Sequence, residues 1–462
     1  MIDTLQSPAG VPSPNSHRPH FAPGPGTLGS TASAISFLLD PFPLLDKVSE
    51  NRSSLVRFHI GKHSLHVIHH PDHVEHVLVK RYTNYTKSSP YALVKTLLGQ
   101  GLLFSEGELH LHQRRMIQPS FQPKFFTKMS GSIMEIISEV VDPWAQRQDG
   151  ARVDIEEEMS EISRRIIGAV LFSRDCPPQI KGILNSETSK LAMLLGGVPF
   201  SPQSKQFQAA VAKLDEAISE VVAKRRRDLE QLPPDEWPSD MLTVLLTARD
   251  KASGEAMSDQ QLRDEIVTTL VAGFDTTARS LNWVFHCLDQ NPEVEEQFRA
   301  ELHEVLGGRL PTYEDLPNLP YTMKVIKETM RVFPPNPIIG RQALQDDVIG
   351  GYFIPKGSIL TVSPYNAHHN PEFWPDPRRF DPERFTPEAI AARPKFAYVP
   401  FGAGVRQCIG QGLAMMTIPF TIATIAQRYQ FRSIPGRKVR YDIKVTFRAR
   451  NQYLMTQHRV GL

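Results

Sequence analysis

The stretch Phe401-Gly402-Ala403-Gly404-Val405-Arg406-Gln407-Cys408-Ile409-Gly410 decides the fold that we expect for this chain. It places one of three cysteines in a glycine-rich loop, directly before an apolar, helix-like run. Backbone N–H groups and a helix dipole favour a thiolate at such a position, so we expect a lowered pKa for the Cys408 thiol. Gly402, Gly404 and Gly410 are expected to adopt positive φ and to let a flat, bulky group approach closely.

Arg406, two residues before the cysteine, supplies a cation that could bind an anionic group. A thiolate ligand, room for a flat cofactor and a nearby cation together describe a haem-thiolate site. The alternative is a buried structural cysteine, which is the commoner fate of this residue type. The pattern F-x-x-G-x-R-x-C-x-G resembles the haem-binding loop of the cytochrome P-450 superfamily at every diagnostic position.

Length and composition are those of an ordinary globular protein, with 462 residues, 40% hydrophobic and 22% charged, and a net charge of +2. The chain is long enough for a large core or more than one domain. The near-neutral balance gives no reason to expect a nucleic-acid partner. Cys176, Cys287 and Cys408 lie too far apart for a disulfide framework or a zinc site, so we expect a reduced, cytoplasmic protein.

The first 34 residues are rich in proline, serine and glycine, and we expect them to form a flexible lead-in. They hold no apolar run that could span a bilayer and no signal peptide, so we expect no membrane anchor. Residues 35–462 are expected to form a single catalytic domain and a monomer. Because that domain uses up the chain, we expect no flavin domain.

Alternating polarity predicts a hairpin over Leu55–Ile60 and Ser64–His69, followed by a helix over Asp72–Val79. Seven histidines fall between His59 and His76. Strand alternation scatters them over both faces, and no cysteine or acidic cluster accompanies them. We therefore expect no functional metal there.

Further helices are expected over 132–172, 179–197, Lys205–Leu229 and Ser258–Asp289. The run Lys224-Arg225-Arg226-Arg227 is interpreted as a solvated face near a helix C-terminus. Strands are expected at Val348–Ile354 and Ser358–Ser363, and a final hairpin over 439–457, which includes Asn451-Gln452-Tyr453. The resemblance implies that the tip of this hairpin reaches the pocket. The resemblance implies that apolar residues near 190–200 belong to a substrate-access lid.

The helix expected over Ser258–Asp289 carries Ala272-Gly273-Phe274-Asp275-Thr276-Thr277 inside an apolar wall. Buried Asp and Thr are costly unless paired or used. Thr276 can bond back to the carbonyl of Ala272 and bend the helix, and Gly273 should open space beside it. One interpretation is an Asp/Thr pair tolerated at a kink. The other is a dioxygen groove with a proton relay, because A-G-x-D-T-T resembles the family's oxygen-activation motif and implies that Asp275 and Thr276 are catalytic.

His110 and Arg114 are four residues apart and share one face of a short basic helix, expected over His110–Met116. A solvated basic face is the alternative to an anion clamp. The resemblance implies that His110, Arg114, Arg341 and Arg406 bind the haem propionates. It also implies that Phe401, Gly402 and Gly410 contact the cofactor, with Phe401 shielding the sulfur.

Glu328 and Arg331 stand three residues apart, a spacing usually seen in surface ion pairs worth under ~1 kcal/mol. Here they resemble the family's buried E-x-x-R pair. The third member would be Arg384, and all three are expected to be structural.

The resemblance implies a mainly α fold with a smaller β-rich region and haem b between the long central helix and the cysteine loop. It identifies the chain as a soluble bacterial-type monooxygenase that receives electrons from NAD(P)H through a ferredoxin and its reductase. Apolar walls predict a lipophilic substrate, which leaves a terpenoid, a fatty acid, a polyketide or a steroid open. Among these we favour a terpenoid-like skeleton. The wall residues expected are Ile266, Val267, Leu270, Val271, Ala272, Ile338 and Ile339.

Three alternatives stay open. A peroxide-driven peroxygenase would not need Asp275 and Thr276. A haem-binding sensor would give no product with a reductant system. A non-haem helical protein would show no Soret band even after haem is supplied.

Overall fold

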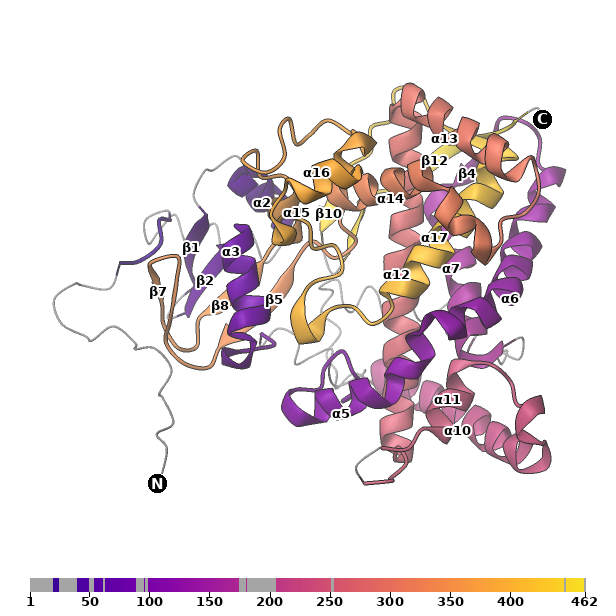
Figure 1. The fold of residues 1–462 in the computed structure, drawn as a ribbon, viewed down its shortest axis with the longest axis horizontal. Coiled ribbons are helices and arrows are strands. Elements are labelled where there is room, and N and C mark those ends of the chain that lie inside the picture. The colour runs from indigo at the N-terminus through magenta and orange to yellow at the C-terminus, as the bar shows by residue number, and fades with distance from the viewer. Residues whose placement is uncertain are drawn as a thin grey trace, which may run out of the picture.

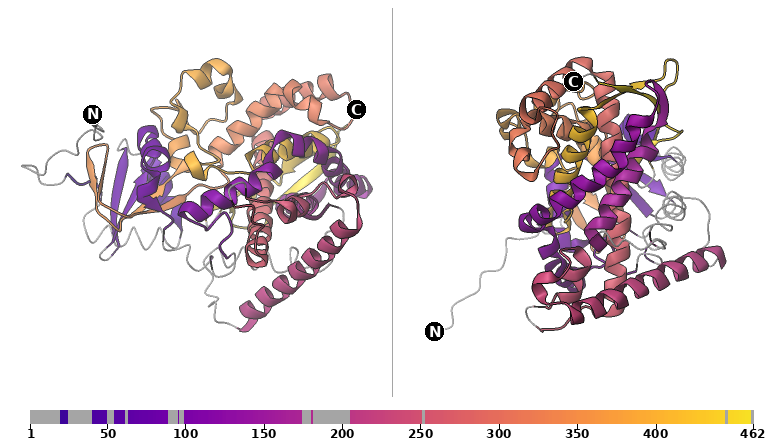
Figure 2. Two further views of the ribbon diagram at one scale, coloured as in Figure 1. Left: turned by 60° about the horizontal axis from the view of Figure 1, so that its bottom comes forward. Right: turned by 90° about the vertical axis from the view of Figure 1, so that its right-hand side faces the viewer.

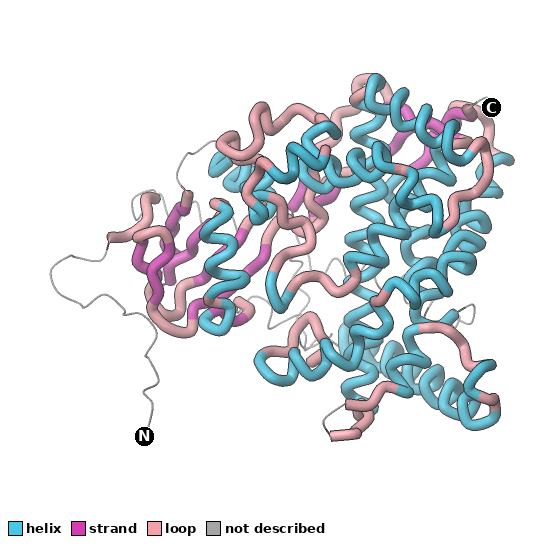
Figure 3. The backbone as a smooth tube through the Cα atoms, in the orientation of Figure 1, coloured by secondary structure: helices cyan, strands magenta, loops and turns pink. Residues whose placement is uncertain are grey.

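The computed structural model describes residues 20–24, 40–49, 54–60, 63–88, 95, 99–173, 180, 205–250, 253–443 and 446–460. In this part of the chain, helices form the larger body and a strand-rich region lies at one end of it (Figures 1 and 3). The mainly α fold with a smaller β-rich region is therefore confirmed. Among the described helices, none combines the length and the apolar character that crossing a bilayer requires.

The longer helices turn apolar faces toward one large core that runs through the helical body, and several of the short helices pack with strands in two smaller clusters. Their bounds are α2 (Pro41–Ser49), α3 (Pro71–Glu75), α5 (Gly107–Ile117), α6 (Pro123–Val141), α7 (Ile155–Phe172), α10 (Lys205–Gln231), α11 (Met241–Thr247), α12 (Asp259–Gln290), α13 (Pro292–Leu306), α14 (Pro320–Val332), α15 (Pro364–His368), α16 (Pro387–Ala391) and α17 (Gln411–Ala426). A π-helical turn, η1 (His76–Lys80), extends α3, as the sequence predicted for this region.

Helix α12 is the central element of the fold, and Figure 1 shows it running the height of the helical body. Ser258 caps its first turn by accepting a hydrogen bond from the backbone N–H of Gln261. The helix packs against α7 on one side and against α14 and α17 on others. Helix α10 crosses its lower end and extends outward (Figure 2). Most of α12 is enclosed by other helices, and one stretch in the middle of the helix keeps exposed surface.

The β-rich region is built around a mixed sheet with the described order β1-β2-β8-β5-β3. Strands β1 and β2 form the predicted hairpin, and β2 pairs with β8 in parallel. The strands are β1 (Leu55–Ile60), β2 (His63–Ile68), β3 (Tyr85–Thr86), β5 (Ile339–Ala343) and β8 (Ile359–Val362). Within the described residues, no group of three or more His, Cys, Asp or Glu side chains could hold a metal ion.

The helix predicted over 132–172 is wrong in its middle. Helix α6 ends at Val141, β4 (Ala151–Asp154) intervenes, and α7 begins at Ile155. Pro143 lies at the start of a short 3-10 turn, and Gly150 has φ +75°, so the chain leaves the helical path there. The predictions for 179–197 and for a lid near 190–200 lie outside the described residues, apart from Ile180.

The strand predicted over Val348–Ile354 is a hairpin of β6 (Asp347–Ile349) and β7 (Tyr352–Ile354). Gly350 and Gly351 both have positive φ and form its turn. The predicted hairpin over 439–457 is also shorter than expected, because β10 (Tyr441–Ile443) pairs with β11 (Phe447–Ala449). Asn451, Gln452 and Tyr453 lie after β11, outside that hairpin.

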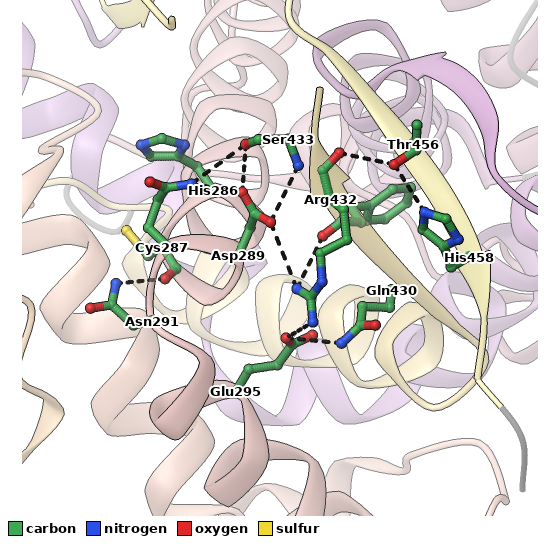
Figure 4. A network of polar contacts seen from close by, with 12 residues as sticks. His286, Cys287, Asp289, Asn291, Glu295, Gln430, Arg432, Ser433, Thr456 and His458 are labelled. Atoms are coloured by element: carbon green, nitrogen blue, oxygen red, sulfur yellow. Dashed lines mark hydrogen bonds and ion pairs between the residues drawn. The ribbon is translucent and has the colours of Figure 1, made fainter. Parts of the chain in front are cut away.

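The chain then continues into β12 (Leu454–Arg459), which pairs with β9 (Tyr429–Ser433) and β4. An ionic network ties this second sheet to the end of α12 (Figure 4). The Arg432 guanidinium lies 2.6 Å from a carboxylate oxygen of Glu295 and 3.7 Å from one of Asp289. The Asp289 carboxylate also accepts a hydrogen bond from the Ser433 hydroxyl at 2.5 Å. This network joins the end of α12 and the start of α13 to the second sheet.

The basic run 224–227 and the N-terminal segment 20–24 both make specific contacts with the rest of the protein. Arg225 is buried, and its Nη1 lies 2.6 Å from Asp240, so the run 224–227 is not wholly a solvated face. Burial of one arginine requires such a partner. The short segment 20–24 contacts both β1 and the β6–β7 hairpin, since the Arg57 backbone N–H donates to the Pro23 carbonyl and the Phe353 backbone N–H donates to the His20 carbonyl.

Candidate active site

The loop that carries Cys408 is shaped by two glycines with left-handed backbone conformations. Gly402 and Gly404 both have φ +69°, as predicted. A Cβ at Gly404 would lie 2.1 Å from the Leu78 carbonyl oxygen, so the loop packs directly on η1. The Cys408 N–H donates to the Phe401 carbonyl at 2.9 Å and closes the loop. The cysteine is thereby presented three residues before α17 begins at Gln411.

Gly410 differs from the prediction, because its φ is −81°. A Cβ placed there would meet the Cys408 sulfur and a Phe121 ring carbon at 3.8 Å, an ordinary van der Waals distance. Neither backbone strain nor close packing therefore requires glycine at this position.

The expected lowering of the Cys408 pKa is also wrong. The thiol keeps solvent-exposed surface, yet desolvation by the surrounding protein raises its pKa above the ordinary value, while the N–H groups of Gly410 and Gln411 and the cation of Arg114 act in the opposite direction. The helix start provides the predicted donors, but desolvation outweighs them. A metal ion would reverse this balance, because a coordinating thiol is deprotonated outright.

The predicted cations gather beside this loop, and Lys87 joins them from the segment after β3. His110 is buried, and burial together with Arg406 and Arg114 lowers its pKa to about 3. Burial, Arg406 and Arg341 likewise lower the pKa of Lys87 to about 7. Besides burial, neighbouring cations lower the pKa of both groups, as expected where positive charge gathers with too little negative charge.

Glu106 is the acidic partner of this cation cluster that the structure shows. Its carboxylate contacts the Arg406 guanidinium and accepts a hydrogen bond from the backbone N–H of Lys87 at 3.0 Å. The Arg406 Nη1 atom is buried with no hydrogen-bond partner. Arg114 donates to the Gln407 carbonyl at 2.8 Å, one residue from Cys408. One carboxylate against several cations, with a guanidinium nitrogen left over, fits a site for a further anionic group such as a pair of carboxylates.

The middle of α12 holds the partly exposed stretch of an otherwise buried helix. Ala272 is exposed and Thr276, one turn later, is half-buried, although the surrounding helix lies in the core. The Thr276 hydroxyl donates to the Ala272 carbonyl at 3.0 Å, as predicted. Gly273 does not open the expected space, because a Cβ there would lie 2.5 Å from Ile167 Cδ1 of α7. Its missing side chain serves close packing between α12 and α7.

Asp275 is held by partners that sequence reasoning missed. One of its oxygens accepts hydrogen bonds from Arg279 Nε at 3.1 Å and Nη2 at 2.8 Å. The other accepts from the Thr446 hydroxyl at 2.6 Å, next to the β10–β11 hairpin tip. Arg279 in turn contacts Glu156 of α7. The i,i+4 spacing of Asp275 and Arg279 could have revealed the ion pair, whereas Thr446 carries no local signal.

The predicted apolar walls divide into two groups. Ile266, Val267 and Leu270 are 0%, 1% and 3% exposed and pack in the helical core, so their assignment to a pocket wall is wrong. Val271, Ala272, Ile338 and Ile339 keep exposed surface. Ile339 lies near the cysteine loop, because a Cβ at Gly402 would be 3.7 Å from its Cδ1. A helix presents only one face to a pocket, and the apolar run alone did not say which.

Glu328, Arg331 and Arg384 come together as predicted. The Arg331 guanidinium forms two hydrogen bonds of 2.7 Å with the Glu328 carboxylate, and both side chains are fully buried. Arg384 Nε lies 3.5 Å from the same carboxylate. These residues join α14 to the chain that leads to the cysteine loop.

The model of the family described as "Cytochrome P450" matches residues 39–452. The chain belongs to the cytochrome P450 family. Members of this family are monooxygenases, and the family implies a haem iron with a cysteine thiolate ligand.

Curated cytochrome P450 relatives include enzymes named for different substrates. Cyclooctat-9-en-7-ol 5-monooxygenase of Streptomyces melanosporofaciens is 32% identical, with 89% of this chain and 90% of the relative covered. Cyclooctatin synthase of the same organism is also 32% identical, with 90% and 91% covered. The human ultra-long-chain fatty acid omega-hydroxylase is 31% identical, with 83% of this chain and 77% of the relative covered.

Solved cytochrome P450 structures have the same fold. A retinoic acid-bound cyanobacterial CYP120A1 superposes with a TM-score of 0.83 at 23% identity, covering 96% of this chain and 100% of the other. The haem domain of cytochrome P450DA gives a TM-score of 0.80 at 23% identity, covering 96% and 99%.

Proposed function

We propose that this cytochrome P450 inserts one oxygen atom into a lipophilic, terpenoid-like molecule at a haem held by Cys408. The observation that carries the haem assignment is the cation cluster beside the Cys408 loop, with its unpartnered Arg406 nitrogen. Haem fits this arrangement because it brings two carboxylates for the cations and an iron for the thiolate. When bound, it supplies oxygen activation and the insertion of one oxygen atom.

The chain's own residues would perform the binding and positioning. Lys87, His110, Arg114, Arg341 and Arg406 would hold the propionates through charge-assisted hydrogen bonds. His110 would remain a neutral donor at pH 7, because its pKa is about 3. Gly402 would leave room for the flat ring, and Phe401 would keep water from the sulfur. Gly410 stays in this proposal as a contact residue, without a conformational requirement.

Thr276 and Asp275 would supply protons on the opposite side of the site. The Thr276 hydroxyl lies on the exposed stripe of α12 and can donate there if it leaves the Ala272 carbonyl. Arg279 and Thr446 hold the Asp275 carboxylate in place, so this proton-exchanging group would stay beside Thr276. Positioned proton donors typically contribute 10²–10⁴-fold to a rate. Electrons would reach the site from NAD(P)H through a ferredoxin and its reductase.

Replacing Thr276 with alanine is expected to uncouple the enzyme by at least about tenfold in product formed per NAD(P)H consumed, because a proton donor is lost. The measurement is product and cofactor stoichiometry with a reconstituted reductant system. Thr277→Ala, one residue along α12, is the matched control. A peroxygenase driven by peroxide would keep its peroxide-supported turnover in Thr276→Ala, so equal turnover of both variants would favour that alternative.

The substrate proposal rests on the walls with exposed apolar surface, Val271, Ala272, Ile338 and Ile339. The relative named for cyclooctat-9-en-7-ol supports a terpenoid skeleton, and the fatty acid omega-hydroxylase marks the competing class. Absorbance titration of the ferric protein with diterpene alcohols and with fatty acids separates the two. Saturable Soret shifts are expected with the terpenoids. Shifts with fatty acids alone, lost when the acid is esterified, would replace the terpenoid assignment with a carboxylate-binding one.

A further inference from the structure

Two adjacent acids at the start of α12 bind the backbone of the segment that precedes α5. The Asp264 carboxylate accepts a hydrogen bond from the Gln100 N–H at 2.7 Å. The Glu265 carboxylate accepts one from the Leu102 N–H at 2.9 Å. The segment Gly99–Ser105 is thus attached to α12 through alternate N–H groups.

Glycines allow this segment to lie directly on the helix. Gly99 has φ +66°, and a Cβ there would lie 2.1 Å from an Asp264 carboxylate oxygen. A Cβ at Gly101 would lie 2.3 Å from the Thr268 hydroxyl oxygen. From the other side, Gln113 of α5 donates to the Gln100 carbonyl at 2.7 Å. The segment is therefore held between α12 and α5, and its position depends on both.

The same segment leads to the cation cluster. Glu106 follows Ser105 directly and contacts Arg406, two residues before Cys408. Helix α5 begins at Gly107 and carries His110 and Arg114. A shift of Gly99–Ser105 on α12 would consequently move the acidic partner of Arg406 and the start of α5.

Glu265 is the less ordinary of the two acids. It is 1% exposed, and its second oxygen, Oε1, is buried with no hydrogen-bond partner. The pKa of Glu265 is raised to about 8, chiefly by burial and to a smaller extent by Asp264, while the Leu102 N–H acts in the opposite direction. Asp264 by contrast has Gln260 and Arg263 as partners, and Arg263 also pairs with Asp215 of α10. The α5 side chain that holds this segment, Gln113, is neutral.

We propose that Glu265 is a positioning residue for the haem site, which in its protonated form holds Gly99–Ser105 on α12 and on ionisation releases it. A buried carboxylate with one hydrogen bond is costly, so opening the segment to water becomes favourable once the group is charged. Only the part of this inference that concerns haem rests on the proposed function. The clamp, by which Glu265 holds Gly99–Ser105 on α12, does not depend on it.

The first test is hydrogen–deuterium exchange of the peptide spanning 99–105 at pH 7 and pH 9. After correction for intrinsic exchange, protection in the unmodified protein is expected to fall about tenfold at pH 9, because a group with pKa near 8 is then about nine-tenths ionised. Glu265→Gln can still accept from Leu102 but cannot ionise, so its protection should not fall. Asp259→Asn, an exposed acid of the same helix, should behave like the unmodified protein.

The second test is haem release to an excess of apomyoglobin. Release is expected to accelerate about tenfold between pH 7 and pH 9 in the unmodified protein but not in Glu265→Gln. Equal pH dependence of exchange in the two proteins overturns the clamp. An exchange result as expected with unchanged haem release overturns its connection to the haem site. A purified protein that takes up no haem overturns the proposed function, while the exchange result still decides the clamp.

Discussion

Replacing Cys408 with serine is expected to lower product formation to background and to remove the spectral signature of thiolate ligation from the haem. The serine hydroxyl does not ionise near neutral pH, so it cannot donate electron density to iron as a thiolate does. The loop itself should survive, because the hydrogen bond that closes it uses the backbone N–H of residue 408 and the Phe401 carbonyl. The loss of product formation should therefore come from the missing thiolate and not from a change in the loop.

The raised pKa of Cys408 adds a second part to this expectation. At neutral pH the free thiol is protonated, so haem uptake at pH 7 is expected to release about one proton from it. Cys408→Ser should not release that proton. Absorbance spectra of the ferrous carbon monoxide complex and the proton release that accompanies haem uptake in weakly buffered solution measure the two effects.

Cys287→Ser provides the matched control, because Cys287 is buried in α12 and its pKa is raised by desolvation. It should keep the thiolate spectrum. A Cys408→Ser protein that retained both the spectrum and turnover would place the ligand elsewhere in the chain.

The parts of the fold that the sequence predicted well are those with a local physical cause. The long α12 follows from its Ser258 cap and its apolar run, and the loop conformation at Gly402 and Gly404 follows from glycine's tolerance of positive φ. The hairpin β1–β2 follows from strand alternation. Glu328 and Arg331 meet because a three-residue helical spacing places them on one face.

The parts that could not be predicted depend on contacts between distant segments. Lys87 joins the cation cluster only because β3 pairs with β5, which carries Arg341. Thr446 reaches Asp275 across 171 residues of sequence. Val267 and Leu270 turned out to lie in the core because neighbouring helices decide which face of α12 is covered. The Cys408 pKa was mispredicted for the same reason, since desolvation depends on the whole surrounding structure.

Replacing Glu328 with alanine is expected to destabilise the fold by about 3–5 kcal/mol, because it leaves the Arg331 charge buried without its counter-ion. Arg331 is fully buried and also donates to the carbonyls of His368, Pro377 and Arg379. Glu328 in turn accepts from the Asp381 N–H at 2.8 Å, so the variant loses that bond as well. The variant therefore weakens the connection between α14 and the segment before the cysteine loop.

Urea denaturation followed by circular dichroism gives the free energy of unfolding, and Glu383→Ala is the matched control. Glu383 forms an ion pair with Lys324 of α14, the helix that also carries Glu328. The Glu383 side chain is 56% exposed, so its loss should cost under ~1 kcal/mol. Equal destabilisation by the two variants would contradict a structural role for the buried pair. The Tyr398 hydroxyl, just before the cysteine loop, donates to the Lys327 carbonyl of α14 at 2.9 Å. Glu328→Ala protein that remains folded should therefore also hold haem less tightly, whereas Glu383→Ala should not. A buried charge without a partner thus links the stability of the scaffold to the geometry of the cysteine loop.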